Sequence, residues 1–388
     1  MRQVDVDFLL SKVVEHFPQI SDINLTVGRP FQVEVHGRLV PVQMHFPTPF
    51  LTPFQTEVIA LNLIRNDRRK LADLFRQGSC DLSYAVGEKI RFRVSVFSQR
   101  GRYSIVMRKL PTEVPTVDGM LLPQIFKQIS LEKNGIVLFT GATGSGKTTS
   151  LAAILNEINE RDPVHIITLE DPVEIVHPHK KATFNQRELG VDFESFAHGL
   201  RAALRQAPKV ILVGEIRDRE TMEIALNASE TGHLVLSTLH TIDATQTLNR
   251  ILSFFDQEEE RQVRIRLAGA LRWVVSQRLL PRIDGARVAV FEIMMNNLRV
   301  QDLILHGETP EKTFYEVIES SRPLGFQTFD QNIIALFQEG LISEETALLY
   351  ASKRAVVKRG VDQIKSLRGE KTTDIEGLTL DHDYLRRG

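Results

Sequence analysis

The chain is poor in cysteine and has no long apolar segment. Its 388 residues include one cysteine, Cys80, which excludes both an intrachain disulfide and a four-cysteine zinc module. No apolar run reaches the roughly 18 to 20 residues that a membrane-spanning helix needs. The opening MRQVDVDFLL carries aspartates where a secretory signal needs basic residues and an apolar stretch. These absences predict a cytoplasmic protein with reduced thiols, whose association with a membrane would be peripheral.

An excess of charge of one sign is also missing. Lys and Arg number 48 against 49 Asp and Glu, the net charge is −1, and aromatic residues make up 7%. A motor that tracks nucleic acid needs a basic groove with aromatic side chains for base stacking. The sequence therefore predicts no nucleic-acid partner. Its length and its balanced composition are those of a globular protein with two or three domains.

The first part of the chain predicts a mixed α/β module. Apolar positions at helical spacing predict a helix over 4–17, and alternation predicts a hairpin over 31–42 and two strands within 90–110. The next stretch, 111–123, holds three prolines and a glycine. Such a stretch is typical of a linker. The predicted first domain is therefore 1–110.

From about residue 124 the pattern alternates between apolar strands and amphipathic helices. Strands are predicted at 135–140, 165–170, 210–216 and 233–240, with helices at 147–160, 193–206 and 219–230. Continuously apolar strands that alternate with helices predict a parallel sheet covered on both faces. Beyond 255 the chain is expected to be mainly helical. The stretch 361–388 has little apolar content and is expected to be a mobile tail.

A glycine-rich motif, GATGSGKT at 141–148, lies between the first of these strands and the first helix. It fits the phosphate-binding loop of nucleoside triphosphatases, in which glycines let backbone N–H groups surround phosphate oxygens. Lys147 would reach the β- and γ-phosphates, and the Thr148 hydroxyl would ligate Mg²⁺. The predicted cofactors are ATP and Mg²⁺. The predicted nucleotide-binding residues are Gly141, Ala142, Thr143, Gly144, Ser145, Gly146, Lys147, Thr148 and Thr149.

Acidic residues end two of the predicted strands. Glu170 and Asp171 end one, and Glu215 ends another. Ligands of an open parallel sheet gather at the carboxyl ends of its strands, which is where these acids are expected. One acid could hold the metal ion through water, and another could orient or deprotonate the attacking water.

Two histidines flank the last predicted strand of the sheet. His233 and His240 stand at its opposite ends and in opposite phases of the strand alternation, so they cannot chelate one metal ion. His240, at the carboxyl end, could reach the γ-phosphate. For a single histidine, a place in the core or on the surface is the commoner outcome.

Four segments in this order resemble the secretion-ATPase superfamily of hexameric motors, and within it the type IV pilus retraction ATPases of the PilT/PilU type. They are GATGSGKTTS, ITLEDPVEIVH, APKVILVGEIRD and TGHLVLSTLHT. QRELGVDFESFAHGLRAALRQAP, RFRVSVFSQR and LGFQTFDQNI extend the likeness, which runs from about residue 4 to 355. Lys209 departs from the pattern, since the family usually has aspartate there. The segment 296–308 matches the stretch associated with retraction only loosely.

The resemblance implies a fold and an assembly. The fold class is α/β: a PAS-like domain over 1–110 and a RecA-like ATPase domain over 124–360 with a helical C-terminal part. The motor would be a homohexamer with its nucleotide sites between subunits. It would be cytoplasmic, peripheral at the inner membrane, and docked on the pilus platform protein.

The resemblance also implies roles for single residues. Glu170 would be the catalytic glutamate that activates water, and Glu215 would support Mg²⁺. His240, and in second place His233, would sense or position the γ-phosphate. Arginines would complete the site of a neighbouring subunit, where phosphate charge builds up. The matching positions are Arg93, Arg108 and Arg205, although a solvated strand face is the ordinary place for a single arginine.

The function that follows is ATP hydrolysis that powers pilus retraction, the removal of pilin subunits that underlies twitching motility. Two alternatives stay open. The chain could be an accessory retraction ATPase that depends on a principal, paralogous motor. It could also be a pilus extension or type II secretion ATPase, although those relatives typically add N-terminal domains and a four-cysteine module.

Overall fold

The computed structural model describes residues 2–42, 49–87 and 90–370. The described residues form two compact units, one within 2–121 and 152–214 and the other within 122–151 and 215–370. This division differs from the predicted domains, because 152–214 groups with the N-terminal residues. Residues 111–123, the predicted linker, contain no helix and no strand.

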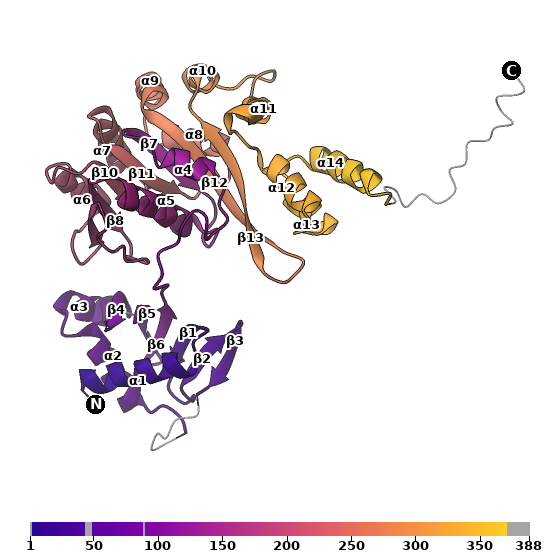
Figure 1. Cartoon of the computed structure of the whole chain (residues 1–388). Coiled ribbons are helices and arrows are strands. Elements are labelled where there is room, and N and C mark those ends of the chain that lie inside the picture. Colours follow the sequence, from indigo (N-terminus) through magenta and orange to yellow (C-terminus); the bar gives the residue numbers. More distant parts are fainter. Residues whose placement is uncertain (1, 43–48, 88–89, 371–388) are drawn as a thin grey trace, which may run out of the picture. The chain divides into compact units, whose positions relative to one another are not determined.

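The N-terminal residues form a six-stranded sheet of the order β3-β2-β1-β6-β5-β4, antiparallel throughout (Figure 1). Its strands are β1 Ile20–Leu25, β2 Gln32–Val35, β3 Arg38–Pro41, β4 Ser79–Val86, β5 Ile90–Gln99 and β6 Arg102–Lys109. The helices are α1 Gln3–His16, α2 Pro53–Ile64 and α3 Arg68–Gln77. The predicted first helix, the hairpin and both later strands are confirmed.

The two faces of this sheet follow the alternation of the sequence. Along β5 the side chains of Phe92, Val94 and Val96 are fully buried and belong to a core that α1 and α2 share. The alternate positions Arg91 and Arg93 therefore point to the other face. The sheet thus has one apolar face, covered by helices, and one face that carries arginines.

The second sheet has seven strands in the order β13-β12-β7-β11-β10-β8-β9. They are β7 Gly135–Thr140, β8 His165–Glu170, β9 Thr183–Glu188, β10 Val210–Val213, β11 Leu234–Leu239, β12 Leu271–Pro281 and β13 Arg287–Met295. The four predicted strands are all present, and β10 ends earlier than expected. Four of the pairings are parallel: β7 with β11, β7 with β12, β8 with β10, and β8 with β9.

Six helices lie in the central part, and α5, α6 and α7 match the three that the sequence predicted there. They are α4 Ile125–Ile129, α5 Lys147–Arg161, α6 Phe196–Ala203, α7 Arg219–Glu230, α8 Ala244–Leu252 and α9 Glu260–Ala270. In one unit α7 packs on β7 and β11, and in the other α6 packs on β8 and β10. Because β7 is buried along its whole length and β8 is buried from Ile166 to Glu170, neither sequence alternates between apolar and polar residues.

The expectation of a mainly helical chain beyond 255 missed the long antiparallel hairpin of β12 and β13. A short apolar run cannot be assigned to strand or helix from periodicity alone, which explains the omission. The Asp284-Gly285 pair between the two runs was the available signal for a hairpin turn.

Helices cover the end of that hairpin (Figure 1). The C-terminal helices are α10 Leu298–His306, α11 Phe314–Ser320, α12 Phe329–Gln338, α13 Glu344–Tyr350 and α14 Arg354–Leu367. α12, α13 and α14 share one apolar core with Leu280 of β12 and Val290 of β13.

The predicted tail starts too early, because α14 continues to Leu367 with Val361 and Ile364 buried. Residues 371–388 lie outside the described part of the chain. Across the described ranges, no helix combines the length and the apolarity that a membrane crossing requires.

The aromatic contacts of Phe126 predict a stability effect. Its ring is fully buried, edge-on to Phe139 (5.7 Å between centroids) and Phe291 (5.1 Å). We expect Phe126→Ala to lower the free energy of unfolding of this unit by about 3 kcal/mol or more, because a cavity replaces the ring. Urea denaturation measures the loss. Leu131→Ala, at a nearby position that is 53% exposed, is the control and should cost about 0.5 kcal/mol or less.

Candidate nucleotide site

The loop Gly141–Gly146 joins the end of β7 to the start of α5. Gly141 has φ +141° and Gly146 has φ +91°, values that favour glycine. A Cβ on Gly141 would lie 2.3 Å from the backbone oxygen of Gln277, and one on Gly146 would lie 2.8 Å from its Nε2. Both glycines are therefore favoured by their conformation, and at Gly141 the close approach of the β12 backbone also excludes a side chain.

Gln277 is a residue that the sequence did not point to. It lies on β12, is 3% exposed, and its Oε1 accepts a hydrogen bond of 2.8 Å from Ser150 Oγ on α5. Beside it, Thr140 Oγ1 at the end of β7 donates to Ser276 Oγ at 2.9 Å. The loop thus rests on a buried polar layer supplied by β12, far along the chain, for which the glycine motif gives no signal.

Lys147 is buried beneath the loop. Its Nζ donates to the carbonyl oxygens of Gly141 at 2.7 Å and Ala142 at 3.0 Å. Burial lowers the pKa of Lys147, while the nearby Glu215 carboxylate opposes that shift. Ser145 Oγ is buried without a hydrogen-bond partner among the described residues. An ammonium group and an unpartnered hydroxyl at a helix N-terminus fit a phosphate group.

The other nucleotide-binding candidates surround this lysine. Ala142, Thr143 and Gly144 are exposed along the loop, and Thr148 is exposed in the first turn of α5. Thr149 is half-buried beside it. The exposed Thr148 hydroxyl is therefore accessible to a metal ion that a bound triphosphate would bring.

Glu215 and His240 are brought together. Glu215 follows β10, His240 follows β11, and His240 Nε2 lies 3.3 Å from Glu215 Oε2. Arg217, which the sequence reasoning did not select, contacts the other carboxylate oxygen at 2.5 Å. Both strands end at this edge, so an acid, an imidazole and a guanidinium group converge there, in the same unit as Lys147.

His233 lies before β11, away from the phosphate loop of its own chain, so a role at the γ-phosphate stays a prediction that would require a neighbouring copy. It precedes β11, its backbone oxygen accepts a hydrogen bond from Gly135 N–H at the start of β7, and its Nδ1 lies 3.0 Å from the Ala228 oxygen. The loop begins at the other end of β7, about 20 Å away at 3.3 Å per residue. Within one chain His233 therefore stabilises the turn between α7 and β11.

Glu170 ends β8 and is buried. Its Oε1 accepts hydrogen bonds from Thr168 Oγ1 at 2.6 Å and from Gln186 Nε2 at 2.9 Å. Burial raises the pKa of the Glu170 carboxyl to about 7, against the effect of these two hydrogen bonds. A carboxyl group with a pKa near neutrality is suited to proton transfer at ordinary pH.

The candidate arginines of the N-terminal sheet face each other. Arg93 on β5 is the register partner of Arg108 on β6, and Arg108 Nε contacts Asp22 Oδ1 at 3.0 Å. Like charges directly opposite each other on a sheet are unfavourable unless an anion lies near them. Arg91, on the same face, was missed by the sequence reasoning, and its charge opposes the raised pKa of Glu170.

Arg205 is not brought to Glu170 within the chain. It is exposed just after α6, next to Gln206, whose backbone oxygen lies 3.0 Å from Nδ1 of His165 at the start of β8. Glu170 stands at the opposite end of that strand. A role for Arg205 in hydrolysis would therefore require a neighbouring copy.

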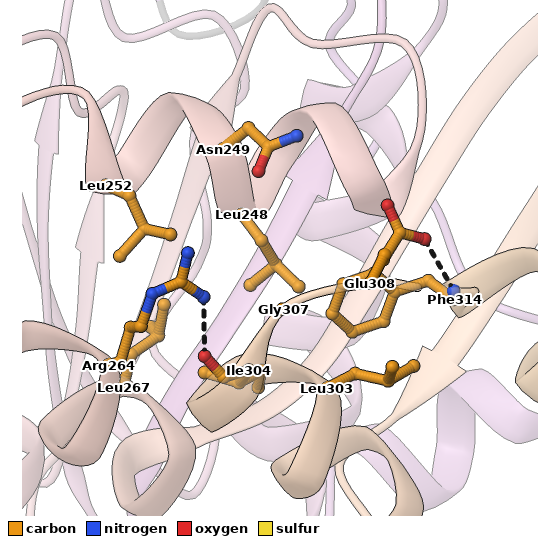
Figure 2. A pocket seen from close by; sticks show the side chains of 10 residues that line it. All are labelled: Leu248, Asn249, Leu252, Arg264, Leu267, Leu303, Ile304, Gly307, Glu308 and Phe314. Atoms are coloured by element: carbon orange, nitrogen blue, oxygen red, sulfur yellow. Dashed lines mark hydrogen bonds between the residues drawn. The ribbon is translucent and has the colours of Figure 1, made fainter. Parts of the chain in front are cut away.

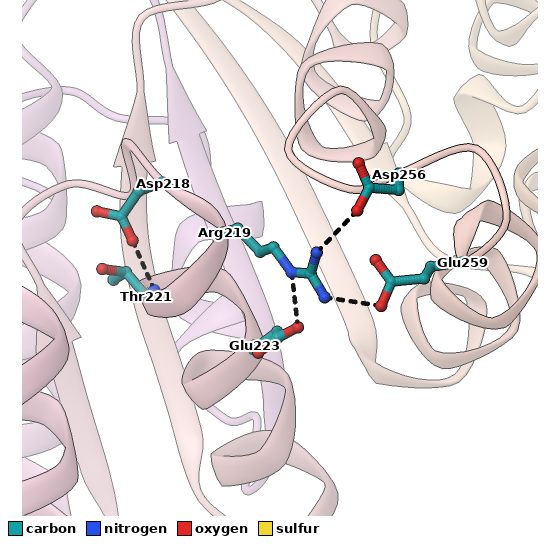
Figure 3. Close-up of polar contacts among 6 residues, drawn as sticks. All are labelled: Asp218, Arg219, Thr221, Glu223, Asp256 and Glu259. Carbon is teal, nitrogen blue, oxygen red and sulfur yellow. Dashed lines mark hydrogen bonds and ion pairs between the residues drawn. The ribbon is translucent and has the colours of Figure 1, made fainter.

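Arg219, in the first turn of α7, anchors the segment that follows Glu215 through ion pairs (Figure 3). Asp218 caps α7 by accepting from Thr221 N–H at 2.8 Å. The guanidinium group of Arg219 then contacts three carboxylates, those of Glu223 at 3.1 Å, Asp256 at 3.2 Å and Glu259 at 2.7 Å. The start of α7 is thus tied to the connection between α8 and α9.

A cavity of about 180 Å³ lies among α8, α9, α10 and α11 (Figure 2). Arg264 there donates to the Ile304 oxygen, and Glu308 accepts from Phe314 N–H, each at 2.7 Å. The remaining lining residues are Leu248, Asn249, Leu252, Leu267, Leu303 and Gly307. The cavity contains none of the nucleotide-site candidates and is smaller than the roughly 300 to 1,000 Å³ of drug-sized ligand sites.

Comparison with known proteins places the chain. Residues 74–331 match the family described as type II/IV secretion system protein. The chain belongs to this family. The type IV pilus ATPase PilU of Pseudomonas aeruginosa is 40% identical over 370 residues, which cover 93% of each protein. The type IV pilus retraction ATPase PilT of the same organism is 39% identical over 84% of this chain and 93% of its own length.

Solved structures agree with that assignment. The crystal structure of the pilus retraction motor PilT with bound ADP is 39% identical, with a TM-score of 0.81 over 91% of this chain and 98% of that one. The ATPase DotB of Legionella pneumophila is 31% identical, with a TM-score of 0.75 over 88% of this chain and 95% of that one. The predicted family, α/β fold class and P-loop ATPase activity are confirmed. The chain is an ATPase and binds nucleotide.

The close approach of β12 predicts the effect of one added methyl group. We expect Gly141→Ala to weaken ATP binding by about ten-fold or more, because its Cβ would meet the Gln277 backbone and the loop would have to shift. Fluorescent-nucleotide titration measures the dissociation constant. Gly285→Ala is the matched control, since Gly285 also has a positive φ (+84°) but no atom within 4 Å of an added Cβ. Equal losses in both variants would contradict the interpretation.

Proposed function

We propose that this chain is a Mg²⁺-dependent motor ATPase that powers retraction of a type IV pilus. The observation that carries the proposal is the convergence, in one unit, of the loop over buried Lys147 with the Glu215–His240 pair at 3.3 Å. Relatives named as a pilus retraction ATPase and a twitching motility protein support the mechanical task.

In the proposed reaction, backbone N–H groups of the loop and the Lys147 ammonium group bind the β- and γ-phosphates. Thr148 and Glu215 would hold Mg²⁺, which neutralises charge on the phosphate oxygens when bound. His240, beside Glu215, orients the γ-phosphate. These residues fix the phosphorus atom for in-line attack by water.

Glu170 is the proposed general base. It takes a proton from the attacking water as the bond between the γ-phosphorus and the bridging oxygen breaks, which leaves ADP and inorganic phosphate. The guanidinium groups of Arg93 and Arg108, and in the third place Arg205, would come from a neighbouring copy and stabilise the charge that develops.

The proposed assembly is a homohexamer, in which such sites lie between copies and hydrolysis changes how neighbouring copies pack. The motor would be cytoplasmic and peripheral at the inner membrane, docked on the platform protein of the pilus. An accessory role beside a paralogous motor ATPase is the second candidate, supported by the likeness to PilU over 93% of both chains.

Two substitutions separate binding from chemistry. We expect Lys147→Ala to abolish tight ATP binding, because the buried ammonium group at the phosphates is lost. Glu170→Gln should bind ATP normally and hydrolyse it at least about 100-fold more slowly, because the base is lost. Isothermal titration and phosphate release measure the two quantities. Normal turnover in both variants would contradict the proposed roles.

The environment of Glu170 predicts the pH dependence. Only the ionised carboxylate can accept a proton, and burial raises its pKa to about 7. Turnover at saturating ATP should therefore rise about ten-fold per pH unit below that pKa and level off above it. A rate that stays constant from about pH 5 to 8 would contradict Glu170 as the base.

The cellular task is tested by deleting the gene and imaging pili. Excess unretracted filaments are the result expected for a principal retraction motor. An unchanged phenotype that becomes hyperpiliated only when a paralogous motor is also lost would assign the accessory role. Bald cells would contradict retraction and indicate extension.

A further inference from the structure

The carboxylate of Glu170 is held through one of its two oxygens. Thr168 Oγ1 donates to Oε1 at 2.6 Å and Gln186 Nε2 donates to the same oxygen at 2.9 Å. The two donors come from neighbouring strands, since Thr168 on β8 and Gln186 on β9 are register partners. Among the described residues, these hydrogen bonds leave Oε2 as the oxygen that can accept a proton.

The amide of Gln186 can face Glu170 in one orientation only. Its Oε1 accepts from the backbone N–H of His177 at 2.8 Å, and its Nε2 donates to the backbone oxygen of Ile175 at 2.8 Å. A backbone N–H can only donate and a carbonyl oxygen can only accept, so exchanging the oxygen and nitrogen would break both contacts. The N–H group that reaches Glu170 is therefore fixed by the main chain of 175–177.

The charges around Glu170 do not provide a substitute for this donor. The Glu174 carboxylate raises the pKa of Glu170, and the Arg91 guanidinium lowers it by a smaller amount. On β9, Glu188 is the register partner of Glu170, and its carboxylate accepts from Ser83 Oγ and from Val173 N–H. The adjacent Asp171 adds a further carboxyl group after the strand.

His177 supplies no cation either. Its ring stacks on Phe184 at 4.4 Å between centroids, and burial lowers its pKa to about 4, so it is neutral at physiological pH. Its contribution is the backbone N–H that orients Gln186. Among the described residues, the neutral hydrogen bonds from Thr168 and Gln186 therefore favour the charged form of Glu170 more than the Arg91 charge does.

We propose that Gln186 is a positioning residue for ATP hydrolysis, which presents a fixed N–H donor to Oε1 of Glu170 and so leaves Oε2 for the attacking water. This inference rests on the proposed role of Glu170 as the base. Gln186 acts through Glu170 and does not contact the nucleotide itself.

Removing the donor should destabilise the ionised carboxylate more than the protonated one. The acid limb of the pH–rate profile, the range in which turnover rises with pH, should then move to higher pH. The rate above that limb should also fall, because Oε2 is no longer held toward the attacking water. A change that only loosened the loop would instead lower the rate at all pH values and leave the limb in place. The position of the limb therefore separates the two explanations.

Two variants isolate the donor. Gln186→Glu keeps the length of the side chain and an acceptor for His177 N–H, but replaces the amide N–H group by an oxygen. Gln186→Leu removes both functions. Asn185→Leu is the matched control, because Asn185 is the preceding amide on β9 and its Nδ2 contacts His165 Nε2 at 2.9 Å, at the other end of β8.

The experiment measures turnover at saturating ATP against pH in the full-length chain. We expect the acid limb to move up by about one unit in Gln186→Leu, which lowers turnover about ten-fold at pH 6. The shift should be larger in Gln186→Glu, because two adjacent carboxyl groups would share a proton. Asn185→Leu should keep the limb of the unmodified chain.

The inference would be overturned if the acid limb of the pH–rate profile stayed at the same pH in both Gln186 variants as in the unmodified chain. This holds whether or not the rate fell uniformly. Glu170→Gln, measured in the same series, keeps the two proposals apart. If that variant retained turnover, the assignment of the base would fail. If Glu170→Gln lost turnover while the Gln186 variants showed an acid limb at the same pH as the unmodified chain, only the positioning role of Gln186 would fail.

Discussion

A buried ammonium group with oxygen partners is the constraint on which the nucleotide site depends. Lys147 sits beneath its own loop and donates to the carbonyl oxygens of Gly141 and Ala142. A buried charge without such partners would cost several kcal/mol. The loop can supply them because Gly141 and Gly146 have positive φ values and lie against Gln277. Phosphate oxygens would offer the same ammonium group stronger, charged acceptors in place of carbonyls.

The chemistry gathers where strands end. Glu215 and His240 follow the neighbouring strands β10 and β11, and Glu170 ends β8. Each acid is held differently. Glu215 contacts a guanidinium group and an imidazole, whereas the carboxyl of Glu170 is buried among neutral donors, which leaves its pKa near 7. Environments of this kind suit the two carboxyl groups to different tasks, and only that of Glu170 is buried enough to bring its pKa to about 7 for proton exchange.

Sequence patterns predicted β7, β8, β10, β11 and the phosphate loop because those features are local. The bounds of β7 and β8 follow from continuous apolar runs that end at glycine or at an acid. The partners that hold the site could not be predicted in this way. Gln277 behind the loop is brought there by sheet pairing, and so is Gln186 beside Glu170. The sequence also could not show that, within one chain, His233 and Arg205 lie near the strand ends opposite the phosphate loop and Glu170. Their positions follow from the backbone contacts of His233 and Gln206.

We propose that each nucleotide site is completed by arginines of a neighbouring copy of the chain. The direct test mixes two variants that are each expected to be inactive alone, Lys147→Ala and the double variant Arg93→Ala with Arg108→Ala, and measures turnover of the mixture. A shared site predicts that mixing restores part of the activity, since the first variant supplies arginines and the second supplies an intact loop. Mixed assemblies that remain inactive at every ratio, or an isolated single copy that hydrolyses ATP at full rate, would contradict the account.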